Sequence, residues 1–482
     1  MKKLIAIWVL IIIFLVGCNS NAQTLNSTPK NLDELLGVIN SNHKLVIKPE
    51  VDYDKYITDY KSENISWNSD YPNYYDGSKA LTYDEISEDV NYLFKCLKDG
   101  YGLYNYFGGD DIFDTSKDKL LEKYKHANSI SINVFFKDLI ENLAFIKDFH
   151  FRIYGETTNK EKSAYIFDKY EFQKINGKYI NSSNGKAVLS FNESKELDDI
   201  FKLSISSDGT LVYYPIIISD EINYSINIKY SDESEENILY TTDRYSYKLN
   251  NEIKLDIKSE IPIIRVTRMG FDQSVNGDNA RKFLEYATQY KDEKIVIVDL
   301  RNNFGGNGML PQKWMMNFTS KFVPTNFSSL KYVTMEQIKK YIYPLSNNYQ
   351  PIDELVNIYG FEQISDSFSK ALCQKDEFIS NDNLLIILVN KQTFSAGEMF
   401  VDIAHNLENT IIVGTNTAGG LTGDNVGSIT LSNSKIPVSF GNGLSFFPKN
   451  YFEEFVGFKP DLWVKGDAEE AVLKLIENMK IK

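Results

Sequence analysis

The sequence has little of what several protein classes need. Only three cysteines and four histidines occur in 482 residues, which excludes a disulfide framework and disfavours a histidine-rich metal centre. The motif H-E-x-x-H is absent, so a metalloprotease is not expected. There is no basic block, and the formal net charge is −14, which makes nucleic acid an unexpected partner. We therefore expect no metal and no other cofactor, and a fold that its hydrophobic core stabilises.

A hydrophobic run begins the chain. Two lysines precede the apolar residues 4–16, a stretch too short to span a bilayer comfortably and typical of a signal peptide, here residues 1–17. The run ends in L-V-G-C at Cys18 and resembles the lipobox of bacterial lipoproteins. That resemblance implies cleavage before Cys18, a lipid on its sulfur, and export to a bacterial membrane, at the cell surface or in the periplasm. A plain secretory signal and an uncleaved anchor are the alternatives.

The rest of the chain divides by its residue pattern. Residues 18–60 are polar and start without periodicity, which indicates a tether between lipid and domain. Residues 61–155 show helical spacing, and residues 156–260 consist of short alternating runs broken by turn residues, which predict strands. Residues 261–482 alternate strand and helix, and the continuous apolar runs KIVIVDL and LLIILVN predict strands covered on both faces. This pattern predicts an α/β core with parallel strands, capped by a helical excursion at residues 325–380.

Ser395 lies at the junction between the run LLIILV and a short amphipathic helix that begins at Ala396. A serine there can be an N-cap, whose hydroxyl accepts hydrogen bonds from the first helical amides. It can also be a nucleophile, if a base and an oxyanion hole are close. The helix would then direct its free amides and positive dipole end at the attack site, with the Ala396 amide as a natural donor. The leading glycine of G-x-S-x-G is missing, which disfavours an ordinary α/β-hydrolase.

A pair of glycines forms the second candidate element. Gly305 and Gly306 lie in D-L-R-N-N-F-G-G-N-G, directly after the strand-like run IVIV. Such glycines let backbone amides approach a bound oxygen without an intervening side chain, and they could form half of an oxyanion hole. From the glycines alone, a tight strand-to-helix turn that needs positive φ is the preferred explanation. A dinucleotide-binding loop is disfavoured, because the G-x-G-x-x-G spacing is not met.

His150 is the best-placed candidate for a general base. It lies in D-F-H-F beside Asp148, at the end of a helical segment. His43 falls in or near the tether, His126 lies in a polar segment, and His405 lies on the helix after the serine, nearly three turns away. A purely structural role for His150 is the alternative.

Two adjacent glutamates, Glu453 and Glu454, lie near a glycine and a Pro-Asp turn in Y-F-E-E-F-V-G-F-K-P-D. Such a pair is normally solvated at the surface. Only one glutamate would need to face a histidine in order to orient it. The residues alone therefore leave both glutamates open for that role.

These elements occur in the order D-x-H, D-L-R-x-N-x-G-G, S-A-G-E, V-G-T-x-T-A-G and E-x-x-G-x-x-P-D. Together they resemble the tail-specific (C-terminal-processing) serine peptidases, a family that includes the tricorn protease core. The resemblance covers roughly residues 262–465. It implies a crotonase-like spiral core, a polypeptide substrate, and loop-stabilising rather than chemical roles for Asp148, Asp299 and Arg301.

The family divides by its base. One branch uses a lysine about two dozen residues after the serine, but no lysine occurs between Ser395 and Lys435. The other branch, which resembles tricorn, uses the histidine of D-x-H and a glutamate near P-D. The resemblance therefore implies Ser395 as the nucleophile, His150 as the base and Glu454 as the residue that orients it. It also implies an oxyanion hole from the amides of Gly305 or Gly306 and of Ala396.

Many relatives carry a PDZ domain, of which residues 156–260 show only a faint echo in F-Q-K-I-N-G. We expect a degenerate PDZ or an unrelated β-domain there. The sequence predicts a membrane-anchored serine endopeptidase that forms an acyl-enzyme. A non-proteolytic protein that binds a lipophilic ligand or a peptide on the same fold is the alternative. The composition also permits a surface adhesin, but no motif supports one.

Overall fold

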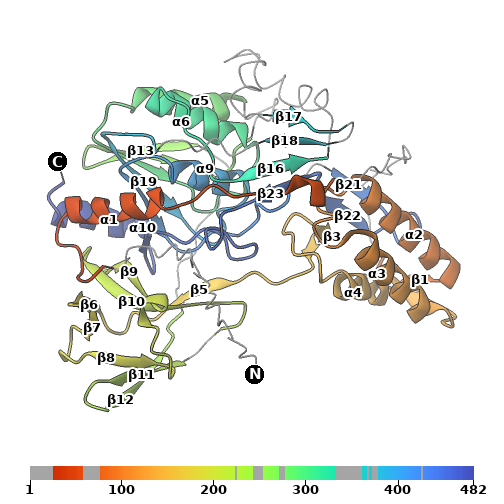
Figure 1. Cartoon of the computed structure of the whole chain (residues 1–482), viewed down its shortest axis with the longest axis horizontal. Coiled ribbons are helices and arrows are strands. Elements are labelled where there is room, and N and C mark those ends of the chain that lie inside the picture. Colours follow the sequence, from red (N-terminus) through yellow and green to blue (C-terminus); the bar gives the residue numbers. More distant parts are fainter. Residues whose placement is uncertain are drawn as a thin grey trace, which may run out of the picture.

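The computed structural model describes residues 25–57, 76–222, 225–242, 253–270, 277–332, 361–365, 368–371, 378–424 and 427–481. Three parts are visible in Figure 1: a helical region, a β-rich segment and an α/β core. The helical region lies at the right of the view and the β-rich segment at the lower left. Within these described ranges, no helix has the length and apolar character needed to cross a membrane.

Parallel strands form the centre of the α/β core. The neighbours β14, β15, β19, β20 and β24 run parallel to one another, as the strand–helix alternation predicted. Their bounds are Ile261–Arg265, Ile295–Asp299, Leu384–Val389, Thr410–Gly414 and Leu462–Trp463. At one edge, β13 (Lys254–Lys258) pairs with β14 in the antiparallel direction.

Helices cover both faces of this sheet. Every residue of β15 and β19 is buried, and successive side chains enter two different hydrophobic clusters because a strand alternates its side chains between faces. Val298 packs in a cluster with α5, α6 and α9, whereas Ile297 packs with α1 and α10. These helices span Gly277–Gln289, Met309–Thr319, Ala396–Ala404, Leu32–Lys44 and Ala468–Asn478. The core is therefore a three-layered α/β structure.

The middle of the chain is β-rich, as predicted, and continues the sheet of the core. Strand β9 pairs in parallel with β24 through Ser204 and Trp463, and β10, β6 and β7 follow β9 in the same sheet. Strands β8, β11 and β12 form a separate sheet over an aromatic cluster. Strands β5 to β12 span Ser163–Ile166, Phe172–Ile175, Lys178–Asn181, Val188–Phe191, Phe201–Ile205, Leu211–Ser219, Ser225–Tyr230 and Glu235–Leu239. The predicted fold class, an α/β core with a helical N-terminal region and a β-rich middle, is confirmed.

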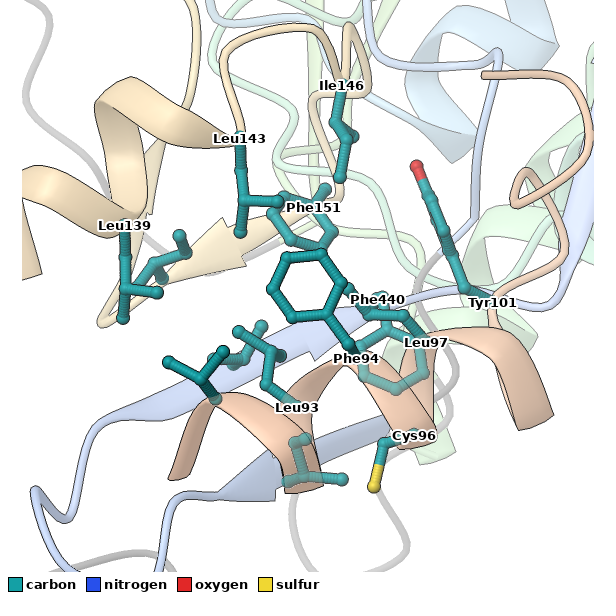
Figure 2. Packing of buried hydrophobic residues seen from close by; sticks show 14 of the residues in the cluster. Leu93, Phe94, Cys96, Leu97, Tyr101, Leu139, Leu143, Ile146, Phe151 and Phe440 are labelled. Carbon is teal, nitrogen blue, oxygen red and sulfur yellow. The ribbon is translucent and has the colours of Figure 1, made fainter. Parts of the chain in front are cut away.

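The helical region packs against strands from the far end of the chain. Helices α2 (Tyr83–Gly100), α3 (Gly109–Tyr124) and α4 (Ile132–Asn142) share one hydrophobic cluster with Phe440 and other C-terminal residues. Figure 2 shows Phe440 beside Phe94 and Leu97 of α2. Strands β3 and β4 pair into the sheet of β21 and β22. Strands β1 to β4, β21 and β22 span Ala80–Leu81, Ile130–Ser131, Arg152–Ile153, Glu156–Thr157, Gly427–Thr430 and Pro437–Phe440. This pairing holds the loop of residues 143–151 against the core.

The segment predicted as a helical excursion, residues 325–380, forms strands and not helices in its described parts. Its described ends form strands β16 (Ser328–Lys331), β17 (Phe361–Gln363) and β18 (Ser369–Ala371), in one sheet with β23 (Gly443–Phe446). Because β16 pairs with a strand more than a hundred residues later, local periodicity did not reveal it. The rest of the helical prediction lies outside the described residues.

The segment predicted as a tether, residues 18–60, is attached to the fold over most of its described length. Helix α1 buries Leu35 and Ile39 in the cluster beneath the sheet. The chain is fastened before the helix as well, since the Asn26 carbonyl accepts a hydrogen bond from the Gly177 amide at 2.8 Å. Sequence analysis missed this helix because its apolar stripe is short and follows a polar start. From Asn26 to the end of α1 this segment is therefore part of the fold, and residues 18–24 of the predicted tether lie outside the described residues.

Candidate active site

Ser395 occupies the turn between β19 and α9 in an unusual backbone conformation. Its φ is 52° and its ψ is −115°, a combination that residues other than glycine rarely adopt. Glu398 supports this conformation, because its Oε2 accepts a hydrogen bond from the Ser395 amide at 3.0 Å. The Ser395 Oγ lies 3.2 Å from Nε2 of His150. Ser395 is thus the N-cap residue of α9, and its hydroxyl also lies within reach of an imidazole.

His150 reaches Ser395 across 245 positions of sequence. The Asp148 carboxylate shapes its loop by accepting hydrogen bonds from the His150 amide and from the Tyr101 hydroxyl, both at 2.9 Å. The imidazole packs on the ring of Phe394, with 4.8 Å between ring centroids. The histidine is therefore held on the residue that directly precedes the serine.

The surroundings keep His150 neutral. Burial lowers its pKa to about 4, while the negative charge of Asp424 opposes the shift and the positive charge of Arg152 adds to it. Nε2 can accept the serine proton only if the ring proton is on Nδ1. That Nδ1 atom is buried, and the backbone of Gly423 favours the protonated ring, which partly opposes the lowering of the His150 pKa. At neutral pH the imidazole thus has the uncharged form that a general base requires.

Of the two adjacent glutamates, Glu454 is the one at the histidine loop. Its Oε1 accepts a hydrogen bond from the Phe149 amide at 2.8 Å, and its Oε2 accepts one from the Thr422 amide at 3.0 Å. Glu453 is exposed and forms a 3.0 Å ion pair with Lys162. The Glu454 carboxylate therefore holds the backbone next to His150, and these hydrogen bonds do not go to the imidazole.

Two carboxyl groups contact this loop, the buried Asp148 and the partly buried Glu454. Desolvation raises the pKa of both; the negative charge of Asp148 raises that of Glu454 further, and the negative charge of Asp424 raises that of Asp148. Like charges that are close and poorly solvated do not ionise independently. The pair therefore carries less than its full negative charge at neutral pH.

Both candidate glycines adopt positive φ, 79° at Gly305 and 136° at Gly306, which favours glycine at each position. A β-carbon on Gly305 would lie only 2.7 Å from the β-carbon of Ser395, so this loop directly adjoins the serine. The Gly305 amide already donates to Oδ1 of Asn303 at 2.9 Å. The Gly306 amide makes no backbone hydrogen bond within the described ranges, and Ala396 is the first residue of α9, where amides lack helical partners.

Glu398 is a residue to which sequence analysis gave no role. It is fully buried, and four donors converge on its carboxylate. These are the Ser395 amide at 3.0 Å, the Thr417 hydroxyl at 2.6 Å, the Gly419 amide at 2.7 Å and the Gly420 amide at 2.9 Å. The available signal was an acidic residue in the first turn of an otherwise apolar helix, within the S-A-G-E motif. Glu398 joins the serine turn to the T-A-G-G loop.

Lys391, the lysine nearest to Ser395 in the sequence, does not form a serine–lysine pair. Its ammonium donates to the carbonyls of Thr417, Ala418 and Phe455 at 3.2, 2.9 and 2.9 Å. Burial lowers the pKa of Lys391 to about 8. The lysine therefore ties two loops together through their backbones.

The other buried histidines belong to a separate cluster. Nε2 of His43 lies 2.9 Å from Oδ1 of Asp461, and Nδ1 of His405 lies 3.1 Å from the Tyr451 hydroxyl. The two rings pack edge to face at 4.6 Å. These contacts fasten helix α1 to the core.

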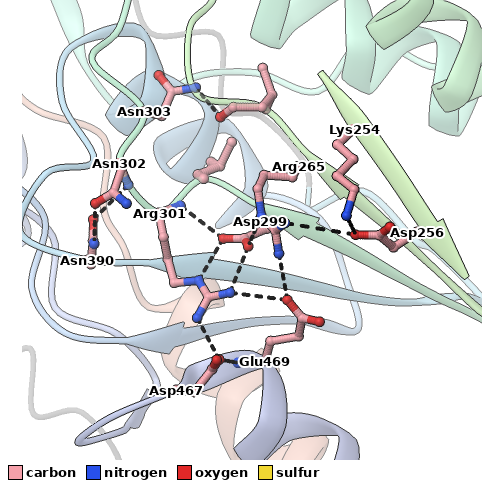
Figure 3. Close-up of polar contacts among 12 residues, drawn as sticks. Lys254, Asp256, Arg265, Asp299, Arg301, Asn302, Asn303, Asn390, Asp467 and Glu469 are labelled. Carbon is pink, nitrogen blue, oxygen red and sulfur yellow. Dashed lines mark hydrogen bonds and ion pairs between the residues drawn. The ribbon is translucent and has the colours of Figure 1, made fainter. Parts of the chain in front are cut away.

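Asp299 and Arg301 belong to a network of charged residues, drawn in Figure 3. Asp299 Oδ2 accepts hydrogen bonds from Arg301 at 2.7 Å and from Arg265 at 2.9 Å. Arg301 also reaches Asp467 at 2.8 Å, and Arg265 reaches Glu469 at 2.7 Å. The network links the start of the glycine loop to helix α10, which agrees with a loop-stabilising role. Cys18, the remaining residue predicted for a function, lies outside the described residues.

Comparison with known proteins supports a peptidase. Residues 260–464 match the family model described as peptidase family S41. A solved structure that the chain matches is that of mature CPAF, with 13% sequence identity, 83% of this chain and 96% of that chain covered, and a TM-score of 0.42. A second is the photosystem II D1 C-terminal processing protease, with 12% identity, 80% of this chain and 96% of that chain covered, and a TM-score of 0.35. A third is the tricorn protease, with 13% identity, 83% of this chain and 37% of that chain covered, and a TM-score of 0.34. No curated protein sequence matches the chain.

The family match and the α/β fold define the class of this protein, a serine peptidase. The part of the chain that matches this family model, residues 260–464, is also the part that carries most of the five ordered motifs.

Proposed function

We propose that this protein is a membrane-anchored serine endopeptidase in which Ser395 is the nucleophile and His150 is the general base. The observation that carries the proposal is the 3.2 Å separation between Ser395 Oγ and His150 Nε2. A serine becomes nucleophilic when a neutral imidazole can accept its proton. The low pKa of His150 supplies that neutral form.

In the first half-reaction, Ser395 Oγ attacks the peptide carbonyl carbon while Nε2 of His150 takes the hydroxyl proton. The amides of Gly306 and Ala396 donate hydrogen bonds to the oxyanion that forms. Gly306 is favoured over Gly305 because the Gly305 amide already donates to Asn303. The C–N bond then breaks, and the proton on Nε2 passes to the leaving amine, which leaves an acyl-enzyme on Ser395.

In the second half-reaction, water attacks the acyl carbonyl and His150 takes a proton from it. The Ser395 oxygen leaves, receives that proton, and the new carboxylic acid is released. Glu454 acts as a positioning residue in both halves, because it fixes the Phe149 amide next to His150. The negative charge of Asp424 favours the imidazolium that forms in each transition state.

Casein hydrolysis by the purified protein tests the chemistry. We expect Ser395→Ala and His150→Ala to lose activity by at least about 1000-fold, since a nucleophile and its base act as a unit. Ser320→Ala is a matched control, because Ser320 also has a positive φ, 57°. His126→Ala is the control for loss of a histidine, because His126 is exposed. Activity that survives His150→Ala would remove the histidine from the mechanism.

Membrane attachment is a second part of the proposal and is tested separately. The L-V-G-C sequence at Cys18 supports it. In cells fed a labelled fatty acid, we expect the wild-type protein to carry label and to sediment with membranes. Cys18→Ala should carry no label while its peptidase activity persists. Label on Cys18→Ala would contradict lipidation at this residue.

A further inference from the structure

Arg152 lies beside the proposed serine–histidine pair, and no carboxylate among the described residues forms an ion pair with it. It is the second residue after His150 and begins strand β3. Its guanidinium carbon lies 5.0 Å from the centre of the Phe149 ring and 5.9 Å from that of Phe394. Phe394 precedes Ser395 and packs on the His150 ring at 4.8 Å. The guanidinium and the His150 imidazole therefore lie near the same aromatic ring, that of the residue before Ser395.

The guanidinium is held in a fixed plane, but only part of it is used. Nε donates to the Phe149 carbonyl and Nη1 to the Gly155 carbonyl, both at 3.2 Å. An arginine has five N–H donors, so three of them have no hydrogen-bond partner among the described residues. The two hydrogen bonds orient the guanidinium plane, and the remaining N–H groups can donate to an acceptor on a bound molecule.

Two other arginines of the fold, Arg265 and Arg301, differ from Arg152 in having carboxylate partners among the described residues. Arg265 and Arg301 each bind two carboxylates within 2.9 Å. No carboxylate of the described residues lies within ion-pairing distance of Arg152, although Glu156 and Glu161 act on it from farther away. Arg152 is only partly exposed, and a cation with reduced solvation is costly unless an anion pairs with it.

We propose that Arg152 determines specificity by binding a carboxylate of the polypeptide substrate close to the scissile bond. The inference rests on the proposed peptidase function. A carboxylate fits the free part of the guanidinium by paired hydrogen bonds, whereas a neutral amide cannot supply the charge. The carboxylate comes either from an acidic side chain or from the C-terminus of the substrate.

Binding measured without hydrolysis gives the primary test. The protein carries Ser395→Ala, and the probes are fluorescent nonapeptides of one scaffold, each with one Gln replaced by Glu and an amidated C-terminus. The all-Gln peptide is also prepared as the free acid. We expect one Glu position, or the free acid, to bind about 10- to 100-fold more tightly than its neutral counterpart, as for hydrogen bonds to charged groups.

Arg152→Gln should reduce that ratio to about one, and Arg152→Lys should retain only part of it, because lysine lacks the planar fork. Lys162→Gln is the control, since Lys162 is a nearby cation already paired with Glu453; it should retain the full ratio. General damage to the loop would weaken the charged and neutral peptides equally and leave the ratio unchanged. If Arg152→Gln does not fold, as judged by thermal unfolding, the lysine variant alone provides the comparison.

The two sources of the carboxylate give different results. A preference in the Glu scan assigns a side chain, and a preference confined to the free acid assigns the C-terminus. Equal binding of all charged and neutral peptides overturns the inference, as does a preference that Arg152→Gln retains. Hydrolysis of the same peptides by the unmutated protein is measured in parallel. If nothing is cleaved but the binding ratio depends on Arg152, the peptidase mechanism fails while carboxylate recognition stands.

Discussion

The Oε2 atom of Glu398 lies 3.0 Å from the amide nitrogen of Ser395, so a buried carboxylate supports the strained backbone of the proposed nucleophile. The same carboxylate accepts hydrogen bonds from the Thr417 hydroxyl and from two amides of the following loop. The position of Ser395 therefore depends on a residue three positions later whose side chain makes no contact with substrate in the proposed mechanism.

Glu398→Gln should lower both stability and activity. A glutamine amide group would place two donors where four donors converge, so at least one buried amide loses its acceptor, at a cost of about 1–3 kcal/mol in the free energy of unfolding. Urea denaturation measures this change, and kcat should fall with it. Glu408→Gln, which removes a partly exposed carboxylate 3.5 Å from Lys44, should change neither quantity appreciably.

Gly305→Ala should abolish most activity. The added β-carbon would lie 2.7 Å from the Ser395 β-carbon and 2.9 Å from the Phe394 carbonyl oxygen, so the serine turn or the glycine loop must move. Gly185→Ala is a matched control, since Gly185 has a similar φ of 74° and no atom within 4 Å of the new β-carbon. Measured kcat should fall at least about 100-fold for Gly305→Ala only, because small displacements of reacting groups cost that much. Equal effects of both substitutions would assign the loss to backbone strain.

Glu454→Ala should slow catalysis without removing it. The Phe149 and Thr422 amides lose their acceptor, so the His150 loop loses its fixed position while the imidazole remains. We expect kcat to fall about 10- to 100-fold with little change in KM. Glu453→Ala, at the exposed neighbour, should leave kcat within about twofold. A loss as large as that of His150→Ala would indicate a direct chemical role for Glu454.

The pH profile should lack the ordinary histidine inflection. Because burial lowers the pKa of His150 to about 4, kcat/KM should rise through about pH 4 and show no step near the usual value of about 6.5. Between about pH 4 and pH 6.5 the unfolded chain binds more protons at His150 than the folded chain does, so protonation favours unfolding in this range. The contribution of His150 to stability is therefore lost as pH falls from about 6.5 towards 4. An NMR titration of the imidazole, assigned with His150→Gln, measures the pKa directly, and a midpoint near 6.5 would contradict it.

Helix α1 should stabilise the core. Leu35 is fully buried against residues of the sheet and of α10, so Leu35→Ala should lower the free energy of unfolding by about 2–5 kcal/mol. Leu36→Ala, at the adjacent and only partly buried position, should cost clearly less. Similar small losses at both positions would mean that α1 is not firmly attached in solution.

Sequence analysis predicted the elements whose signals are local. The runs IVIV and LLIILV are recognisable as strands buried on both faces because they are continuous and apolar, and α2 because its apolar residues recur at helical spacing. The approach of His150 to Ser395 could not be read from spacing, since 245 positions separate the two residues. Only the ordered motifs of a known family implied it.

The elements that sequence analysis did not predict, strand β16 and helix α1, share one physical cause. Strand β16 is defined by its pairing with β23, and α1 is stabilised by docking onto the sheet; tertiary contacts decide both elements. The hydrogen bonds of Glu454 go to backbone amides, which leave no trace in the sequence. The contacts of Glu398 therefore become visible only in three dimensions, as does the fact that Glu454, which the family motif pointed to, binds the backbone of the histidine loop.

The fastening of the chain at Asn26 limits how far an anchored enzyme could move. The Asn26 carbonyl accepts a hydrogen bond from Gly177, and the Thr28 amide donates one to Lys174 at 3.0 Å. Asn26 follows Cys18 by eight positions (26 − 18), a distance along the chain that reaches about 29 Å even when fully extended. In a protein lipidated at Cys18, Asn26 would thus stay within about 29 Å of the lipidated cysteine at the bilayer surface. Polypeptides emerging from or bound to the same membrane would meet the protein at high effective concentration, whereas those in the bulk phase would meet it only at the surface.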